Sequence, residues 1–197
     1  MRSYLALAAA SLVTLAAAGM PEPIFGSNKL AARDATCMSA DEANQVALNF
    51  NHLISDYSDE LANASLTVGF VDYSDSVSTL IDSGCTGPQP LGVATFDSRA
   101  AFIAGQGGQP NIPFDQLNVW YNCDTVFLRW RTTLDFTTPA PEFVTGIIVL
   151  ETTSAAGSAQ PWLINTVYSE FNSGAWLVDL GVFVPNCTVP SRRLLRA

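Results

Sequence analysis

The order of apolar and polar positions predicts helices in the first half of the chain. The stretch that follows Ser39 places apolar residues three and four positions apart, as on one face of a helix. These positions are Ala43, Val46, Ala47, Phe50, Leu53, Ile54 and Tyr57. Ser39 and Glu42 have the spacing of a capping box. We therefore predict an amphipathic helix that begins at Ser39.

Two shorter helices and one strand are predicted next. Residues 59–66 have the polar start and the length of a short helix, and the stretch GFVDYSDS from Gly69 has the character of a strand. The segment from Gly84 to Gly92 contains Gly, Pro and Cys, which predicts a loop. A third helix is expected to begin near Ser98 and to end at the glycine cluster that opens at Gly105.

Beyond Pro113 the pattern changes to strands. Five β-rich segments are separated by turn residues: 116–122, 125–134, 143–153, 162–171 and 175–183. Their close spacing favours antiparallel neighbours, because helical crossovers need more residues. Helices followed by strands indicate an α+β fold with helices on one face of a curved sheet.

The stretch SEFNSGAWLVDLG, residues 169–181, alternates on both sides of Asn172-Ser173-Gly174 and is interpreted as a β-hairpin. One parity, Phe171 followed by Trp176, Val178 and Leu180, is expected to pack in the core or against a second subunit. Glu170 and Asn172 are then the pocket or network residues.

Several stretches are typical of one protein family: DEAN from Asp41, FVDYSDSVSTLI, GCTGP, TFDSRAAF, WYNCDTVFLRW, TGIIVLE and SEFNSGAWLVDLG. In these stretches the chain resembles a family of secreted fungal proteins with the nuclear transport factor 2-like cone fold. The resemblance covers nearly all of residues 37–187. It implies three N-terminal helices packed on a strongly curved antiparallel sheet. In the superfamily the cone serves ketosteroid isomerases, polyketide cyclases and scytalone dehydratase, or is a binding cavity, or is filled, so the fold does not choose a function.

The N-terminus has the features of a secretory signal peptide. An Arg precedes about 15 apolar residues and an Ala-rich cleavage site, which predicts cleavage after Ala18 and an extracellular product. Residues 19–36 are expected to be a flexible leader, residues 37–187 one domain and residues 188–197 a basic tail.

The charge of the domain argues against nucleic acid and membranes as partners. Residues 37–187 carry 16 acidic and three basic residues, a net charge of −13, so they repel phosphate groups and anionic lipids.

Four cysteines, Cys37, Cys85, Cys123 and Cys187, predict two disulfides in an exported chain. Of the three possible pairings, Cys37 with Cys187 and Cys85 with Cys123 is favoured slightly. Their spacing does not suggest a metal site, and no cofactor is expected. Two sequons, at Asn63 and Asn186, are candidates for glycosylation.

Few residues suggest acid–base chemistry. The only histidine, His52, lies about 200° from Phe50 around the helix and is expected to face solvent. Asp72, Tyr73 and Asp75 could instead supply a carboxylate base and a hydrogen-bond donor for isomerase-type chemistry. Asp72 and Tyr73 belong to opposite faces of their strand. The alternative is that one face is solvated and the other caps or pairs locally.

The strands supply the remaining pocket candidates. Arg129 and Arg131 share one face, where Glu151 or Glu170 on later strands could pair with them or where they could anchor a ligand. Aromatic residues of the strands, Trp120 and Tyr168 among them, suggest a sheet that is apolar on both faces. Such a sheet needs helices on one face and a second cover, for example a second copy of the chain, on the other.

The sequence therefore predicts a secreted domain that binds a small, largely apolar ligand or a protein partner without catalysis. Two alternatives stay open. One is an isomerase, cyclase or lyase that uses a pocket carboxylate and a tyrosine. The other is an effector-type interaction protein with a filled cone.

Overall fold

The structure is a computed structural model and describes residues 37–84, 89–135 and 143–183. The predicted signal peptide, leader and tail lie outside these residues, as do Cys85, Cys187 and Asn186. The elements are α1 (Ala40–Ser55), α2 (Asp59–Ser65), β1 (Leu66–Tyr73), α3 (Asp75–Leu80), the 3₁₀ helix η2 (Ile81–Gly84), α4 (Arg99–Gln106), β2 (Phe114–Asn122), β3 (Thr125–Thr132), β4 (Thr145–Ser154), β5 (Trp162–Phe171) and α5 (Ser173–Asp179).

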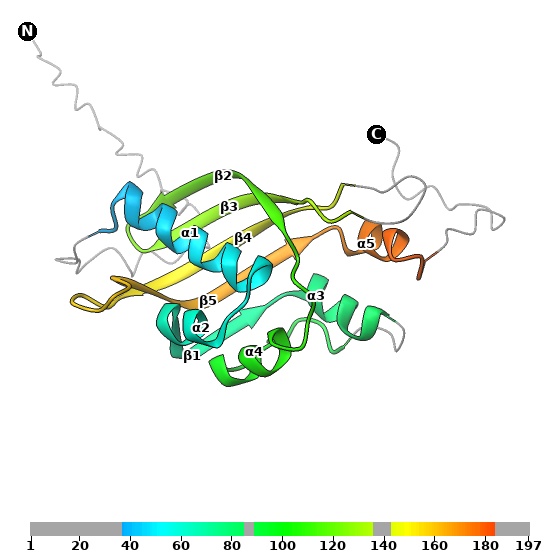
Figure 1. The fold of residues 1–197 in the computed structure, drawn as a ribbon, viewed down its shortest axis with the longest axis horizontal. Helices are drawn as coiled ribbons and strands as arrows, with labels where there is room; N and C mark the ends of the chain where they lie inside the picture. Colours follow the sequence, from blue (N-terminus) through cyan, green and yellow to red (C-terminus); the bar gives the residue numbers. More distant parts are fainter. Residues whose placement is uncertain (1–36, 85–88, 136–142, 184–197) are drawn as a thin grey trace, which may run out of the picture. The chain divides into compact units, whose positions relative to one another are not determined.

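The five strands form one curved sheet in the order β1-β5-β4-β3-β2 (Figure 1). The β2–β3, β3–β4 and β4–β5 pairs are antiparallel, which confirms the predicted meander. The expectation of a wholly antiparallel sheet is wrong, because β1 pairs with β5 in parallel. The chain reverses direction at each turn from β2 to β5, and these turns leave β5 pointing the same way as β1.

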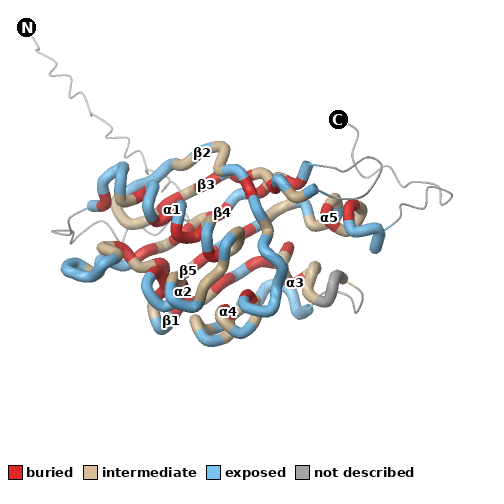
Figure 2. The backbone as a smooth tube through the Cα atoms, in the orientation of Figure 1, coloured by how far each residue is buried: buried red, intermediate tan, exposed pale blue. Residues whose placement is uncertain are grey.

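Helices cover one face of the sheet. Figure 1 shows α1 lying across the strands, with α2 and α4 beside β1. The capping box at Ser39 is present, and the predicted stripe of α1 is buried from Ala43 to Leu53. The core between helices and sheet includes Phe70, Phe102 and Leu128. Figure 2 shows buried residues along the strands, interspersed with exposed and intermediate ones.

The predicted hairpin at residues 169–181 is wrong. The Asn172 side chain accepts a hydrogen bond from Ala175 N at 3.0 Å and caps α5, so the chain turns into a helix after β5. Gly181, at φ 70°, ends this helix with a Schellman pair of bonds, Gly181 N to Val178 O and Val182 N to Leu177 O. Trp176 is buried and packs against Phe171.

A second helix, α3, replaces the end of the predicted strand. The Ser74 hydroxyl accepts from Val77 N at 3.0 Å and caps α3, so the extended chain stops at Tyr73. The sequence SDSV contains this cap, but the alternation before it also favours a longer strand.

The favoured pairing of cysteines is also wrong, because Cys37 forms a disulfide with Cys123. The N-terminal end of α1 lies at the β2–β3 turn, where Met38 N donates to Cys123 O at 2.9 Å. The bond therefore ties the first helix to the sheet. No helix among the described residues is long and apolar enough to cross a membrane.

Candidate functional site

A cavity of about 560 Å³ lies between the sheet and the helices that cover it. Its apolar lining is Phe50, Ile54, Val77, Leu80, Ile81, Phe96, Phe102, Ile112, Phe114, Trp130, Ile148, Phe171 and Trp176. The polar side chains in the lining are those of Asp72, Gln106, Gln109 and Ser169, and the indole N–H of Trp130 is a further polar group. Most of the wall is therefore apolar, with a few polar groups that could orient a ligand.

The aromatic side of the cavity depends on a close approach between strands β3 and β4. Trp130 pairs with Gly146, and a Cβ atom at position 146 would lie 2.6 Å from Trp130 Nε1. The glycine therefore leaves room for the indole to lie over the neighbouring strand. Phe114 and Phe171 contact the indole ring on either side, at centroid distances of 5.2 and 5.5 Å.

Among the described residues, Asp72 is the only one with a titratable side chain in this lining. It lies near the end of β1, where its backbone is held from both sides. Its register partner in β5 is Val167, while Asp72 N donates to Phe96 O and Thr95 N donates to Asp72 O, both at 2.8 Å. These strand contacts direct the side chain toward the cavity.

The Asp72 carboxyl group is buried without compensation. The residue is 5 % exposed, and its Oδ1 atom has no hydrogen-bond partner in the described part of the chain. Burial, and after it the nearby Glu170 carboxylate, together raise the pKa of Asp72 to about 7. An unpaired carboxyl group in an apolar site destabilises a fold, so it indicates a role in function.

Glu170 and Asn172, the expected pocket or network residues, do not line the cavity. Glu170 caps α3: its carboxylate accepts hydrogen bonds from Asp75 N at 2.9 Å, from Ser76 N at 3.1 Å and from the Ser76 hydroxyl. Asn172 caps α5. Both residues thus act on helices that border the cavity, and their network role is structural.

The other strand candidates lie on the opposite face of the sheet, which we call the open face because no described helix covers it. The strand register aligns Trp120, Phe127, Val149, Tyr168 and Tyr73 in one row across all five strands. Trp120 is 51 % and Tyr168 43 % exposed, and Tyr168 stacks on Tyr73 at 5.4 Å. Tyr73 therefore cannot donate to a ligand that Asp72 contacts.

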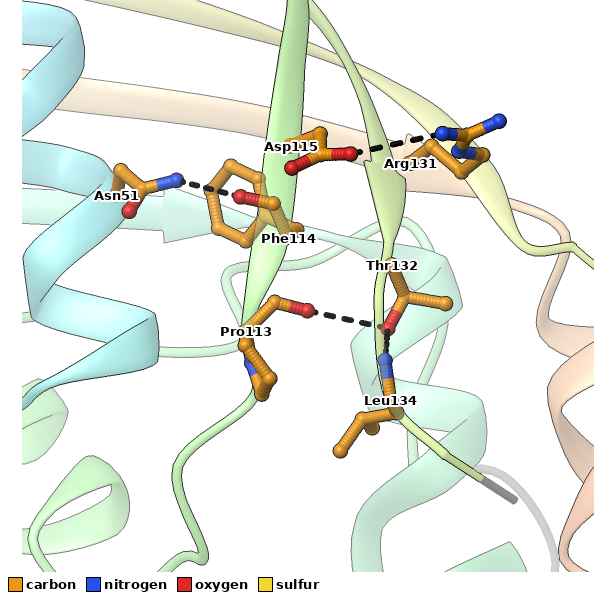
Figure 3. Close-up of polar contacts among 7 residues, drawn as sticks. All are labelled: Asn51, Pro113, Phe114, Asp115, Arg131, Thr132 and Leu134. Atoms are coloured by element: carbon orange, nitrogen blue, oxygen red, sulfur yellow. Dashed lines mark hydrogen bonds and ion pairs between the residues drawn. The ribbon is translucent and has the colours of Figure 1, made fainter.

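Arg129 and Arg131 also lie on the open face. Arg131 pairs with Asp115 at 3.5 Å (Figure 3). The Arg131 guanidinium also lies 5.2 Å from the centre of the Phe143 ring. Arg129 is exposed opposite Ile147 and forms no ion pair within the described residues. The sequence suggests that Glu151 or Glu170 could pair with these arginines, but neither pair is present among the described residues.

Figure 3 also shows how the cavity side of β2 is fixed. Asn51 in α1 donates to Phe114 O at 3.0 Å, and Thr132 donates to Pro113 O at 3.3 Å. Phe114 therefore faces the helices while its neighbour Asp115 faces the other way.

Sequence reasoning missed most of the polar cavity residues. Ser169 shares its strand parity with buried Val167, and Gln106 follows Phe102 by one helical turn, so both signals were present in the sequence. Gln109 lies in a connecting segment and has no such pattern.

His52 is exposed, as its position on the helix predicted. Within the described residues no group of three or more His, Cys, Asp and Glu side chains could hold a metal ion. Asn63 is exposed on α2 and donates to Asp59 O at 2.9 Å.

Comparison with known proteins agrees with this architecture. The family described as NTF2-like domain, where NTF2 is nuclear transport factor 2, matches residues 36–183. A proposed polyketide cyclase from Bacillus cereus is 16 % identical with a TM-score of 0.54, over 75 % of this chain and 87 % of its own.

A loop-truncated variant of IdmH is similar as well. The wild-type IdmH is a proposed polyketide cyclase from Streptomyces antibioticus. The variant is 11 % identical with a TM-score of 0.50, over 71 % of this chain and 99 % of its own. At these identities the likeness shows the fold alone. The comparison with curated proteins found no match.

The buried carboxyl group generates a prediction on stability. The unfolded chain ionises Asp72 near the ordinary pKa of 3.8, whereas the folded chain does so at about 7. Between these values the folded state keeps a proton that the unfolded state loses, so stability falls as the pH rises. We expect the free energy of unfolding of Asp72→Asn to exceed that of the wild type by a few kcal/mol at a pH of about 8, and by much less at about 4.5.

Urea denaturation at both pH values measures this difference, and Asp97→Asn, at an exposed carboxylate, is the control. A gap between wild type and Asp72→Asn that stays constant with pH would show that Asp72 ionises normally.

Proposed function

This chain belongs to the NTF2-like domain family, and from that premise we propose that its cavity binds a small, largely apolar molecule. The observation that carries the proposal is an apolar cavity that contains the buried carboxyl group of Asp72, whose Oδ1 atom has no hydrogen-bond partner among the described residues. A volume of about 560 Å³ lies within the range of small-molecule sites. Apolar walls supply affinity, and a single polar group orients the ligand.

We place this binding outside the cell. The signal-peptide features of residues 1–18 and the resemblance to secreted fungal proteins support export. The Cys37–Cys123 disulfide is typical of an oxidising compartment.

A second candidate function is proton transfer of the isomerase, cyclase or lyase kind. The raised pKa of Asp72, about 7, supports it, because a general base works best near the pH of its surroundings. No tyrosine lines the cavity in the described part of the chain, and the expected donor Tyr73 stacks on Tyr168 across the open face. The side-chain donors that the described lining offers are Ser169, two glutamine amides and the Trp130 indole. Binding alone therefore ranks first.

A third candidate function is that of an effector-type interaction protein, which predicts a filled cone. The cavity among the described residues argues against a filled cone. What remains is the open face, for which the occupant we propose is a second copy of this chain. The apolar row from Trp120 to Tyr73 supplies the contact area, since aromatic side chains and arginine are enriched in interfaces.

The charges beside this row favour a two-fold axis parallel to the strands. Arg129, Ile147 and Glu170 lie in one register row on β3, β4 and β5. A two-fold axis in the interface, parallel to β4 and passing over Ile147, brings the Ile147 residues of the two chains together. It also places Arg129 of each chain opposite Glu170 of the other chain. The arrangement is thus self-complementary in charge.

Cavity binding is tested with the neutral dye Nile red. We expect one dye per chain in native mass spectra and a blue-shifted emission. Ser169→Phe should weaken the affinity by about tenfold or more, because its ring projects into the cavity. Thr166→Phe, which adds the same ring on the open face of β5, is the matched control. Equal binding by both variants would argue against this cavity as the site.

Proton transfer is tested with β-tetralone in D₂O, by NMR of its α-protons. Catalysed exchange should rise with pH around 7, the pKa of Asp72, because the ionised carboxylate is the base. Asp72→Asn should slow it by about 10²–10⁴-fold. Exchange no faster than in buffer would remove this second candidate.

Dimer formation is tested by sedimentation velocity. We expect a dimer for the wild type and a monomer for Ile147→Glu, since a charge at the centre of the open face must be desolvated on contact. Leu48→Glu is the matched control: Leu48 on α1 is 45 % exposed, close to the 47 % of Ile147. If the wild type is a monomer, the open face has another role.

A further inference from the structure

We propose, on the basis of the binding function above, that the ligand is an apolar amine whose ammonium group pairs with the Asp72 carboxylate. Three separate features of the cavity select this class: the sign of its charge, its aromatic walls and the field around it.

The first feature is the charge of the lining. Asp72 is its one ionisable side chain, and no Lys, Arg or His lines the cavity among the described residues. A carboxylate or phosphate ligand would meet a like charge and no counter-charge. An ammonium group brings both the missing charge and the hydrogen-bond donors that Asp72 lacks, since its Oδ1 atom is buried without a partner.

The second feature is the aromatic wall. Seven aromatic residues line the cavity: Phe50, Phe96, Phe102, Phe114, Trp130, Phe171 and Trp176. Their ring faces attract a cation that has left water, by about 0.5 to 2 kcal/mol for each well-placed ring. The same rings pack against the apolar body of the ligand, so one wall serves both parts of an amine.

The third feature is the field at the carboxyl group. Glu170 on β5 is the charged group that acts on Asp72, and it raises the pKa of Asp72, so the local potential is negative. The other elements around the cavity, α1, α3, α4 and the segment from Gln109 to Ile112, contribute no titratable side chain to its lining. The domain charge of −13 further raises the concentration of cations near the protein.

A carbonyl ligand is the alternative that the same pocket allows, and pH separates the two. A carbonyl accepts a hydrogen bond from protonated Asp72, so its affinity should fall as the pH rises through about 7. An amine needs the ionised form and stays protonated until about pH 9–10, so its affinity should rise by up to about tenfold per pH unit and level off above 7.

The test compares para-phenylbenzylamine with para-phenylbenzyl alcohol, which have nearly the same shape, by isothermal titration of the full chain. At a pH of about 8 we expect the amine to bind at least about tenfold more tightly than the alcohol. Asp72→Asn should abolish this preference while the alcohol still binds. Glu151→Gln, which removes one carboxylate on the open face, should leave it unchanged.

Two results would overturn the assignment. One is an alcohol that binds as tightly as the amine, and the other is a preference for the amine that survives in Asp72→Asn. Nile red binding distinguishes a failure of the amine proposal from a failure of the proposed cavity binding. If the dye binds but neither probe does, the amine class is wrong and the binding site stands; if the dye also fails, the proposed function falls with it.

Discussion

The parallel pairing of β1 with β5 is the constraint on which the site depends. It brings the end of β1 beside Glu170, whose carboxylate accepts both Asp75 N and Ser76 N and so caps α3. The chain must therefore leave the sheet after Tyr73 and fold over it as helix α3. That helix supplies Val77 and Leu80 to the cavity wall. One ladder of strand bonds thus positions the carboxyl group and part of its apolar surroundings together.

The same pairing decides which side chain enters the cavity. Successive residues of a strand point to opposite faces, so Asp72 inside requires Tyr73 outside. This arrangement lowers the stability of the fold, because it holds an ionisable group in an apolar site. No group in the described part of the chain forms a hydrogen bond with Asp72 Oδ1. A sequence selected for stability alone would place an apolar residue or an amide there. A ligand that supplies the missing partner would recover this cost on binding.

Much of the fold could be predicted from the sequence where local signals and tertiary packing agree. The capping box at Ser39, the stripe of α1 and strands β2 to β5 are of this kind. The helices α3 and α5 were missed because each is short, and seven residues such as 173–179 fit both a strand and a helix period. Their caps, Ser74 and Asn172, were visible but also fit turns. The parallel edge and the Cys37–Cys123 bond depend on contacts distant in sequence.

The site was predicted in part for a related reason. Strand alternation correctly separated Asp72 from Tyr73 and grouped Arg129 with Arg131, but it cannot say which face meets the helices. That choice depends on where α1 crosses the sheet. Aromatic residues on both faces made the ambiguity worse, because Trp130 and Trp120 are equally apolar in the sequence while one lines the cavity and the other is exposed.

Glu170 connects the sheet with a helix that borders the cavity. It is the register partner of Ile147 on the open face, its carboxylate caps α3, and it adds to the negative field at Asp72. A cation brought to Glu170, such as Arg129 of a second copy, would weaken that field and lower the pKa of Asp72. More of the carboxyl group would then be ionised at neutral pH. Association through the open face would therefore change the charge inside the cavity, and because such coupling is reciprocal, a ligand that ionises Asp72 would change the strength of association.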